Sequence, residues 1–168
     1  FISFSLPYKF FNFKKFYIWY MQYLSVDDLD YYSEYVIKSI KKLNEIIDNK
    51  GYIYQDLKIT GEDIKQLHGV IKIYGHLNLS DNSYINSLGE LNYIKSDLWL
   101  GDRVDEEESL TSLGNLKRVG GDLSLRYSNI EELGGLERVG GNVNLRDTPI
   151  ISLGVLKHVG GNLFLPKR

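Results

Sequence analysis

The 168-residue chain contains no cysteine and no alanine, and it has only three prolines and one methionine. Without cysteine, disulfides, thiolate metal sites and cysteine nucleophiles are excluded, and the redox compartment stays open. The missing alanine, beside heavy use of isoleucine, lysine, asparagine and tyrosine, is typical of an AT-rich coding genome. A strong excess of charge of one sign is also absent, since the net charge is -2. Nucleic-acid binding calls for a strongly basic chain, so this balance predicts no nucleic-acid partner.

What is present is typical of a globular protein. Hydrophobic residues make up 43% and charged residues 25%, which excludes wholesale disorder, and the length suits a single domain. Glycine and phenylalanine divide the chain near residue 51. All sixteen glycines lie at or after Gly51, whereas six of the seven phenylalanines lie within residues 1–16. We therefore expect three parts, residues 1–24, 25–51 and 52–168.

Residues 1–24 form an aromatic and basic segment with eleven aromatic residues, three lysines and no acid. The longest uncharged run, from Phe16 to Val26, has eleven residues, whereas a transmembrane helix needs about 20. No small-residue cleavage site of a signal peptide follows Lys15. Three interpretations stay open: non-native sequence upstream of a start at Met21, a membrane-surface segment, or a packed element. Membrane contact is expected only if the segment is native, and the absence of targeting signals and cysteine favours a cytoplasmic location.

Residues 25–51 are predicted to form an N-terminal capping α-helix. Ser25 or Asp27 can cap its start, and Gly51 can end it. Apolar residues recur at three- and four-residue spacing and would pack on the element that follows: they are Val36, Ile37, Ile40, Leu43, Ile46 and Ile47.

From residue 57 the chain repeats itself. A leucine–glycine–any–leucine motif begins at Leu88, Leu113, Leu133 and Leu153, and a valine–glycine–glycine motif begins at Val119, Val139 and Val159. Alternating apolar pairs occur at Leu57/Ile59, Leu77/Leu79, Leu98/Leu100, Leu123/Leu125, Val143/Leu145 and Leu163/Leu165. The coils are therefore 20, 21, 25, 20 and 20 residues long. A period near 20 residues predicts a mainly β solenoid with a parallel sheet of about six short strands.

Within a coil, each residue type has a structural reason. Alternation places the apolar pair inward and the residue between them outward. Five residues after the first apolar residue comes a small polar group, Asn82, Ser128 or Thr148, which can bond backbone groups freed at a tight turn. The Gly-Gly pairs suit corners with a positive φ or a close backbone approach.

The pattern LxLxx(S/T/N)xI, followed by SLGxL and VGG, resembles short bacterial leucine-rich repeats and the repeats of receptor L domains. The resemblance covers about residues 57–165 and implies a right-handed solenoid that binds proteins, or sometimes glycans, through its strand face. The chain lacks the cysteines of receptor L domains, which argues against a disulfide-stabilised receptor. It also lacks a helix-length segment on the convex side of each coil.

The outward side of the strands is the candidate binding surface. Trp99 would expose a large apolar surface there, unless the longer coil or the N-terminal segment covers it. Arg126 and Arg146 would lie one coil apart and could hold a carboxylate or phosphate, or be solvated beside Asp122 and Asp147. The full set of candidate residues is Lys58, His76, Asn78, Trp99, Asp122, Ser124, Arg126, Asn144, Arg146 and Phe164.

The 25-residue coil carries an acidic loop containing Asp102, Asp105, Glu106, Glu107 and Glu108. Five carboxylates would suit a basic partner or calcium, but the spacing matches no calcium loop, so a solvated loop and no metal site are expected. The three histidines fall at different positions of the repeat, and no catalytic constellation or cofactor motif is indicated. We expect no enzyme and no cofactor. A remote alternative is a β-helix polysaccharide-active enzyme that uses Asp122, Arg126 and Arg146.

The sequence thus predicts a non-enzymatic protein-interaction module whose partner is another protein. The alternative is a structural or adhesion component of a virion or cell surface, which binds neighbouring subunits or glycan. The last residues, Leu163 to Arg168, show no polar cap, and solenoids need caps. Three interpretations stay open: the chain continues, Pro166 and the two basic residues after it guard the edge, or a partner, or a second copy in an oligomer, covers the last coil. We expect the last coil to be the weakest part.

Overall fold

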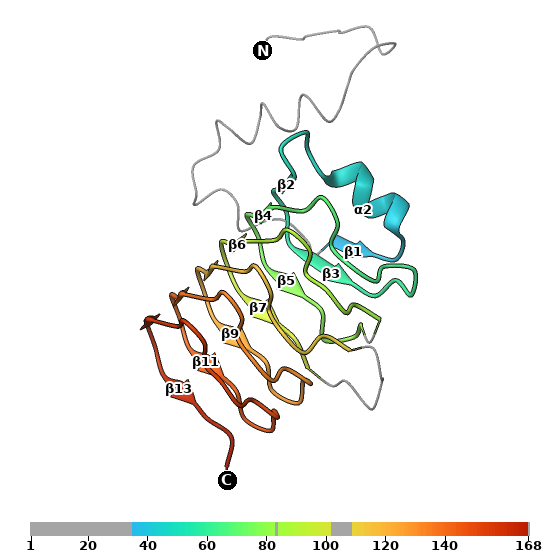
Figure 1. The fold of residues 1–168 in the computed structure, drawn as a ribbon. Coiled ribbons are helices and arrows are strands. Elements are labelled where there is room, and N and C mark those ends of the chain that lie inside the picture. The colour runs from blue at the N-terminus through green and yellow to red at the C-terminus, as the bar shows by residue number, and fades with distance from the viewer. Residues whose placement is uncertain (1–34, 83, 102–108, 168) are drawn as a thin grey trace, which may run out of the picture. The chain divides into compact units, whose positions relative to one another are not determined.

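The computed structural model describes residues 35–82, 84–101 and 109–167, which belong to one compact unit spanning Ser33–Arg168. They form a mainly β parallel solenoid of about six turns, with one short helix near its N-terminal side (Figure 1). The predicted class of fold is therefore confirmed. Residues 1–24 and the acidic residues of the loop 102–108 lie outside the described residues.

A seven-stranded parallel sheet runs along the solenoid. Its order is β1-β3-β5-β7-β9-β11-β13. The strands are β1 (Tyr35–Ile37), β3 (Leu57–Ile59), β5 (Leu77–Asn78), β7 (Leu98–Trp99), β9 (Leu123–Ser124), β11 (Val143–Asn144) and β13 (Leu163–Phe164). Their first residues from Leu57 to Leu163 pair in register. This register gives the coil lengths that the sequence predicted.

The structure adds one strand to the six that were expected. In β1, Tyr35 pairs with Leu57 and Ile37 pairs with Ile59, and Ile37 is fully buried. The sequence pattern missed β1 because residues 36 and 37 also fit the spacing of the predicted helix.

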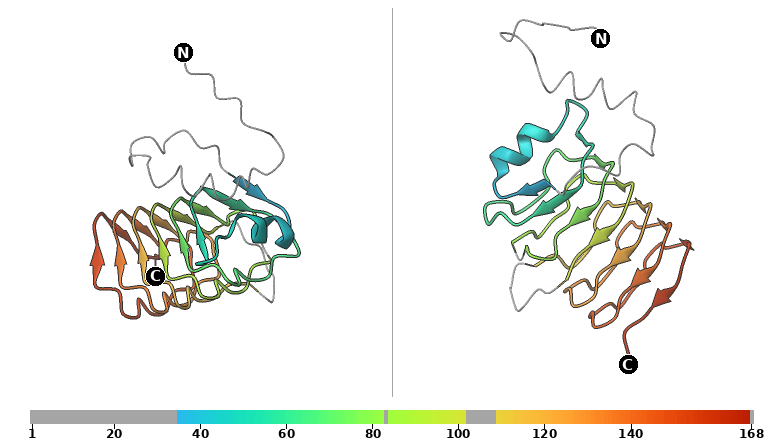
Figure 2. Two further views of the ribbon diagram at one scale, coloured as in Figure 1. Left: turned by 90° about the horizontal axis from the view of Figure 1, so that it is seen from above. Right: turned by 180° about the vertical axis from the view of Figure 1, so that it is seen from behind.

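A second parallel sheet of six strands lies on another side of each coil, in the order β12-β10-β8-β6-β4-β2 (Figure 2). Its strands are β2 (Tyr52–Ile53), β4 (Lys72–Ile73), β6 (Tyr93–Ile94), β8 (Arg118–Val119), β10 (Arg138–Val139) and β12 (His158–Val159). Isolated bridges, such as Glu132 with Ser152, join the coils on a third side. The sequence predicted only corners where this second sheet lies.

The predicted helix over residues 25–51 is wrong in its extent over the described residues 35–51, and its first part, residues 25–34, lies outside the described residues. Within the described residues, the helix α2 covers only Ile40–Ile46, capped by Ser39, whose side chain accepts a hydrogen bond from the backbone N–H of Lys42 at 3.3 Å. Residues 35–37 are strand because they pair with β3, and β-branched residues suit a pleated surface. Of the expected apolar stripe, Leu43 is buried, whereas Val36 and Ile40 are 45% and 43% exposed.

One continuous core fills the solenoid, built from the inward residues of the strands β1 to β11 and from leucines of the repeat motif, with Val159 of β12 packed against it. The small polar residues are buried in it as expected. Asn82 accepts hydrogen bonds from the backbone N–H groups of Tyr84 at 2.8 Å and Ile85 at 2.9 Å, and Thr148 donates to the carbonyl of Leu145 at 2.7 Å. Buried polar side chains thus satisfy the turn backbone.

The two kinds of glycine motif have different structural reasons. The glycine of the leucine–glycine motif has a positive φ, as at Gly134 with φ 56, where a side chain is strained. The first glycine of each Gly-Gly pair instead lies against the preceding coil: a Cβ at Gly140 would be 1.9 Å from the carbonyl oxygen of Gly120. The predicted close backbone approach is therefore confirmed.

Across the part of the chain that the structure describes, no helix has the length and apolar character needed to cross a membrane.

Candidate functional site

In the seven-stranded sheet, the outward positions of the six strands from β3 to β13 form a column of side chains in register. Each lies between two inward apolar residues, as Lys58 lies between the buried Leu57 and Ile59. The column runs Lys58, Asn78, Trp99, Ser124, Asn144 and Phe164. The structure therefore brings six of the predicted candidate residues together on one face, which we call the strand face.

An open depression of about 430 Å³ lies in the middle of the strand face. Trp99 lines it together with hydroxyl, amide and guanidinium groups. Its lining is Asn78, Ser80, Trp99, Leu100, Gly101, Ser124, Arg126 and Tyr127. Four of these are sequence-predicted candidates, and Ser80 and Tyr127 were missed as candidates.

Trp99 has a defined orientation because it stacks on His76 of the preceding coil. Their ring centroids are 5.1 Å apart and the planes differ by 13°. Trp99 remains partly exposed. A ring supported from beneath loses little side-chain entropy on binding, so Trp99 is pre-organised as an aromatic contact.

Arg126 is held by two neighbours. Its Nε donates to Asp147 Oδ2 at 3.0 Å, its Nη2 donates to the hydroxyl of Tyr127, and its guanidinium carbon lies 4.3 Å from the centre of that ring. The hydrogen bond to Asp147 raises the pKa of Arg126. Tyr127 and Asp147 have the positive φ values 63 and 58, a conformation that non-glycine residues seldom adopt.

Arg146 has different neighbours from Arg126. Its Nε donates to Asn144 Oδ1 at 3.0 Å, and its guanidinium lies 5.0 Å from the centre of the Phe164 ring. Lys58, at the other end of the face, forms an ion pair of 2.6 Å with Asp81. Arg126 and Arg146 are therefore positioned by separate contacts, and their guanidinium groups do not form a matched pair.

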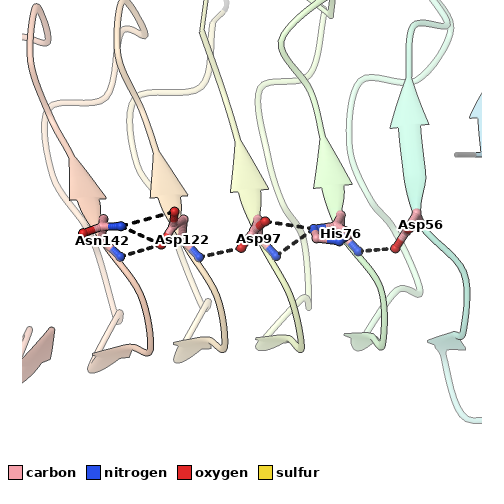
Figure 3. A network of polar contacts seen from close by, with 5 residues as sticks. All are labelled: Asp56, His76, Asp97, Asp122 and Asn142. Atoms are coloured by element: carbon pink, nitrogen blue, oxygen red, sulfur yellow. Dashed lines mark hydrogen bonds and ion pairs between the residues drawn. The ribbon is translucent and has the colours of Figure 1, made fainter. Parts of the chain in front are cut away.

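A ladder of polar side chains lies where each coil turns into the strand face (Figure 3). We call Asp56, His76, Asp97, Asp122 and Asn142 the corner ladder. Asp122 Oδ1 accepts the backbone N–H of Asn142 at 2.6 Å, and Asp97 Oδ1 accepts that of Asp122 at 2.6 Å. His76 Nδ1 lies 3.2 Å from the backbone nitrogen of Asp97 and 3.1 Å from its Oδ2.

The corner ladder explains why aspartate, asparagine and histidine share one repeat position. Each offers an acceptor to the backbone N–H of the next coil, so the ladder satisfies groups that the turn leaves unpaired. Asp122, a predicted binding residue, is therefore a structural residue whose carboxylate contacts both the backbone and the side chain of Asn142. The recurrence of acceptor residues one position before each strand was the signal for this ladder.

The other histidines do not join His76. His68 pairs with Glu90 at 3.5 Å, and His158 is exposed on β12. Among the described residues, no three His, Cys, Asp or Glu side chains are grouped closely enough to hold a metal ion.

Comparisons of the chain with protein-family models, curated proteins and solved structures found no match.

Proposed function

We propose that the chain is a non-enzymatic protein-binding module with the character of a leucine-rich-repeat protein, and that it binds its partner through the strand face. The observation that carries this proposal is the depression beside Trp99, which combines an oriented indole with Arg126, Tyr127 and small polar groups. Tryptophan, tyrosine and arginine are the residues that most often dominate binding energy in protein interfaces.

The surroundings of the depression support a protein partner. Ser80, Asn78 and Ser124 supply hydrogen-bonding groups around an aromatic centre, as a polar rim surrounds the core of an interface. The backbone beneath is fixed by hydrogen bonds between coils, such as Leu100 N–H to Ser124 O at 2.8 Å. Such a face loses little conformational entropy when a partner binds.

A displayed-peptide selection tests this proposal. We expect a phage library of random peptides, panned on the chain, to yield peptides that bind the strand face. Trp99→Ala should weaken those peptides about 30-fold and Arg126→Gln about tenfold, because truncating a central contact residue costs about 2 kcal/mol. Fluorescence polarisation of the selected peptides gives both ratios.

The matched control is Arg138→Gln, which removes the same charge from the second sheet and should leave peptide binding unchanged. Selected peptides that bind the Trp99 and Arg126 variants as well as they bind the original chain would contradict the proposal.

A second candidate, a structural component that associates with neighbouring subunits, has its own observation. The last coil exposes apolar side chains: Ile151 is 84%, Leu165 52% and Phe164 40% exposed. Its strand β13 is an edge strand of the sheet, and unpaired strand edges template association.

Light scattering over a concentration series tests the second candidate. If it is correct, the molar mass should rise with concentration, and Leu165→Asp should return the chain to monomer because a charge would oppose burial of that edge. A constant monomer mass at every concentration would exclude the structural component and leave the protein-binding module as the proposed function.

A further inference from the structure

The outward face of the second sheet carries a line of basic side chains. Its column of outward positions runs Tyr52, Lys72, Tyr93, Arg118, Arg138 and His158. Flanking positions in the same short segments add further lysines. We call the set Lys72, Lys95, Lys117, Arg118, Arg138 and Lys157 the basic stripe.

Acidic groups are scarce in the same segments. Within the described residues 71–74, 92–95, 117–120, 137–140 and 157–160, the one acid is Glu137, which pairs with Lys157 at 3.6 Å. Arg118 and Arg138 are both exposed, and they stand directly beside each other in the register of β8 and β10. Neighbouring strands lie about 4.8 Å apart, so the two positive charges that these strands carry repel each other, and an anion over them would relieve the repulsion.

A tyrosine cluster continues the stripe on strands β2, β4 and β6. The rings of Tyr54 and Tyr74 are stacked with centroids 5.3 Å apart, and Tyr52 and Tyr93 meet Tyr74 edge-on at 5.9 Å and 6.0 Å. Lys72 Nζ lies 5.3 Å from the centre of the Tyr52 ring. Burial, and then the charge of Asp48, raises the pKa of Tyr54 to about 12, and the hydroxyl of Tyr54 donates to Asp48 Oδ2 at 3.1 Å.

The shape of the charged surface selects the kind of anion. The stripe is two to three residues wide, or about 7–10 Å, and it crosses five strands, or about 20 Å. A line of charge matches a linear polyanion better than a membrane, whose charges extend in two dimensions. Proteins that bind single-stranded nucleic acids present aromatic rings beside a line of cations, because the bases stack on the rings while the cations neutralise the phosphates.

We infer that the basic stripe and the tyrosine cluster together form a binding surface for single-stranded nucleic acid. The net charge of -2 argued against such a partner, but that sum averages over all sides of the chain. Acids such as Glu131 and Glu132 lie on the third side of the coils. Asp48, which contacts the tyrosine cluster, accepts hydrogen bonds from the hydroxyl of Tyr54 and the backbone N–H of Tyr52. Asp97 and Asp122 belong to the corner ladder and accept backbone hydrogen bonds.

Fluorescence anisotropy with a labelled oligothymidylate of about 12 nucleotides tests this surface. The full chain should bind it at about 50 mM salt and lose affinity steeply towards about 200 mM. The double variant Arg118→Gln/Arg138→Gln should reduce the log–log salt slope by about 1.4, because each contact with a single-strand phosphate contributes about 0.7. At about 0.1 M salt this corresponds to a loss of about 25-fold.

The charge-matched control is Arg126→Gln/Arg146→Gln, which removes two arginines one coil apart on the strand face and should change binding less than about twofold. Tyr93→Leu should weaken binding about tenfold through lost stacking. Circular dichroism should show that each variant keeps the fold of the original chain.

Three results would overturn the inference. The oligonucleotide fails to bind at about 50 mM salt, both double variants weaken binding equally, or heparin oligosaccharide binds through Arg118 and Arg138 while the oligonucleotide does not. The last result would assign the stripe to a sulfated glycan instead. Because the stripe and the strand face belong to different sheets, failure here leaves the peptide-binding proposal untouched.

Discussion

Replacing Gly140 by alanine should lower the free energy of unfolding by about 3 kcal/mol, the upper range for forcing extra atoms into a close-packed site. A Cβ at Gly140 would lie 1.9 Å from the carbonyl oxygen of Gly120 and 2.9 Å from its carbonyl carbon. Both contacts are with backbone, so no side chain can rotate away. The neighbouring hydrogen bonds, Gly140 N–H to Val119 O at 3.0 Å and Gly141 N–H to Gly121 O at 2.8 Å, would have to stretch.

Gly135→Ala is the matched control for this substitution. A Cβ there meets the flexible Nζ of Lys117 at 2.9 Å and a backbone oxygen at 3.2 Å, and the stability should change by less than about 1 kcal/mol. Urea unfolding followed by circular dichroism measures both variants. Equal stability of the two would contradict the close-approach explanation. It would mean that the corner at Gly140 can rearrange to accept a side chain, as the equivalent position does in earlier coils, where it is occupied by Tyr74 or Lys95.

The period of the solenoid could be predicted because two simple signals coincide in every coil. Alternating apolar pairs place residues such as Leu123 and Leu125 inward, and the repeat motifs fix the distance to the next pair. The 25-residue coil did not hide the pattern, because its extra residues fall between Leu98 and Leu123, outside the strands. The buried Asn82 was predictable for the same reason, since its place in the repeat is shared by Ser128 and Thr148.

The second sheet was missed because a strand of two residues shows no alternation. The pair Arg138–Val139 has one exposed and one buried residue, which fits a strand and a turn equally well. Its basic column is visible only once the register places Arg118 beside Arg138. Nor could spacing predict that Trp99 stacks on His76, because the contact depends on side-chain conformations in two coils. The strand face was predicted as a column of positions, whereas its contacts required the structure.

Leu125→Ala should destabilise the chain by about 3 kcal/mol, whereas Leu165→Ala, at the equivalent position two coils later, should cost less than about 1 kcal/mol. Leu125 is fully buried, and Leu165 is 52% exposed. Removing methyl groups between two stacked coils leaves a cavity that both coils line. At Leu165 the side chain is packed on one side only, and solvent fills the space that is left.

The same asymmetry predicts the order in which the coils open. In a solenoid, stability is a sum of terms between neighbouring coils, and an interior coil is bonded on both sides. Leu125 N–H donates to Asn144 O of the next coil at 2.9 Å, and Ser124 O accepts from Leu100 N–H of the preceding coil at 2.8 Å. In the last coil, Phe164 O accepts from Leu145 N–H at 2.8 Å, and its apolar residues are exposed.

Amides of residues 150–165 should therefore exchange hydrogen fastest, and Leu125→Ala should raise exchange in both neighbouring coils. Uniform protection from residue 98 to residue 165 in a monomeric sample would contradict nearest-neighbour coupling, and uniform protection seen only in an oligomer would place a second chain against the last coil.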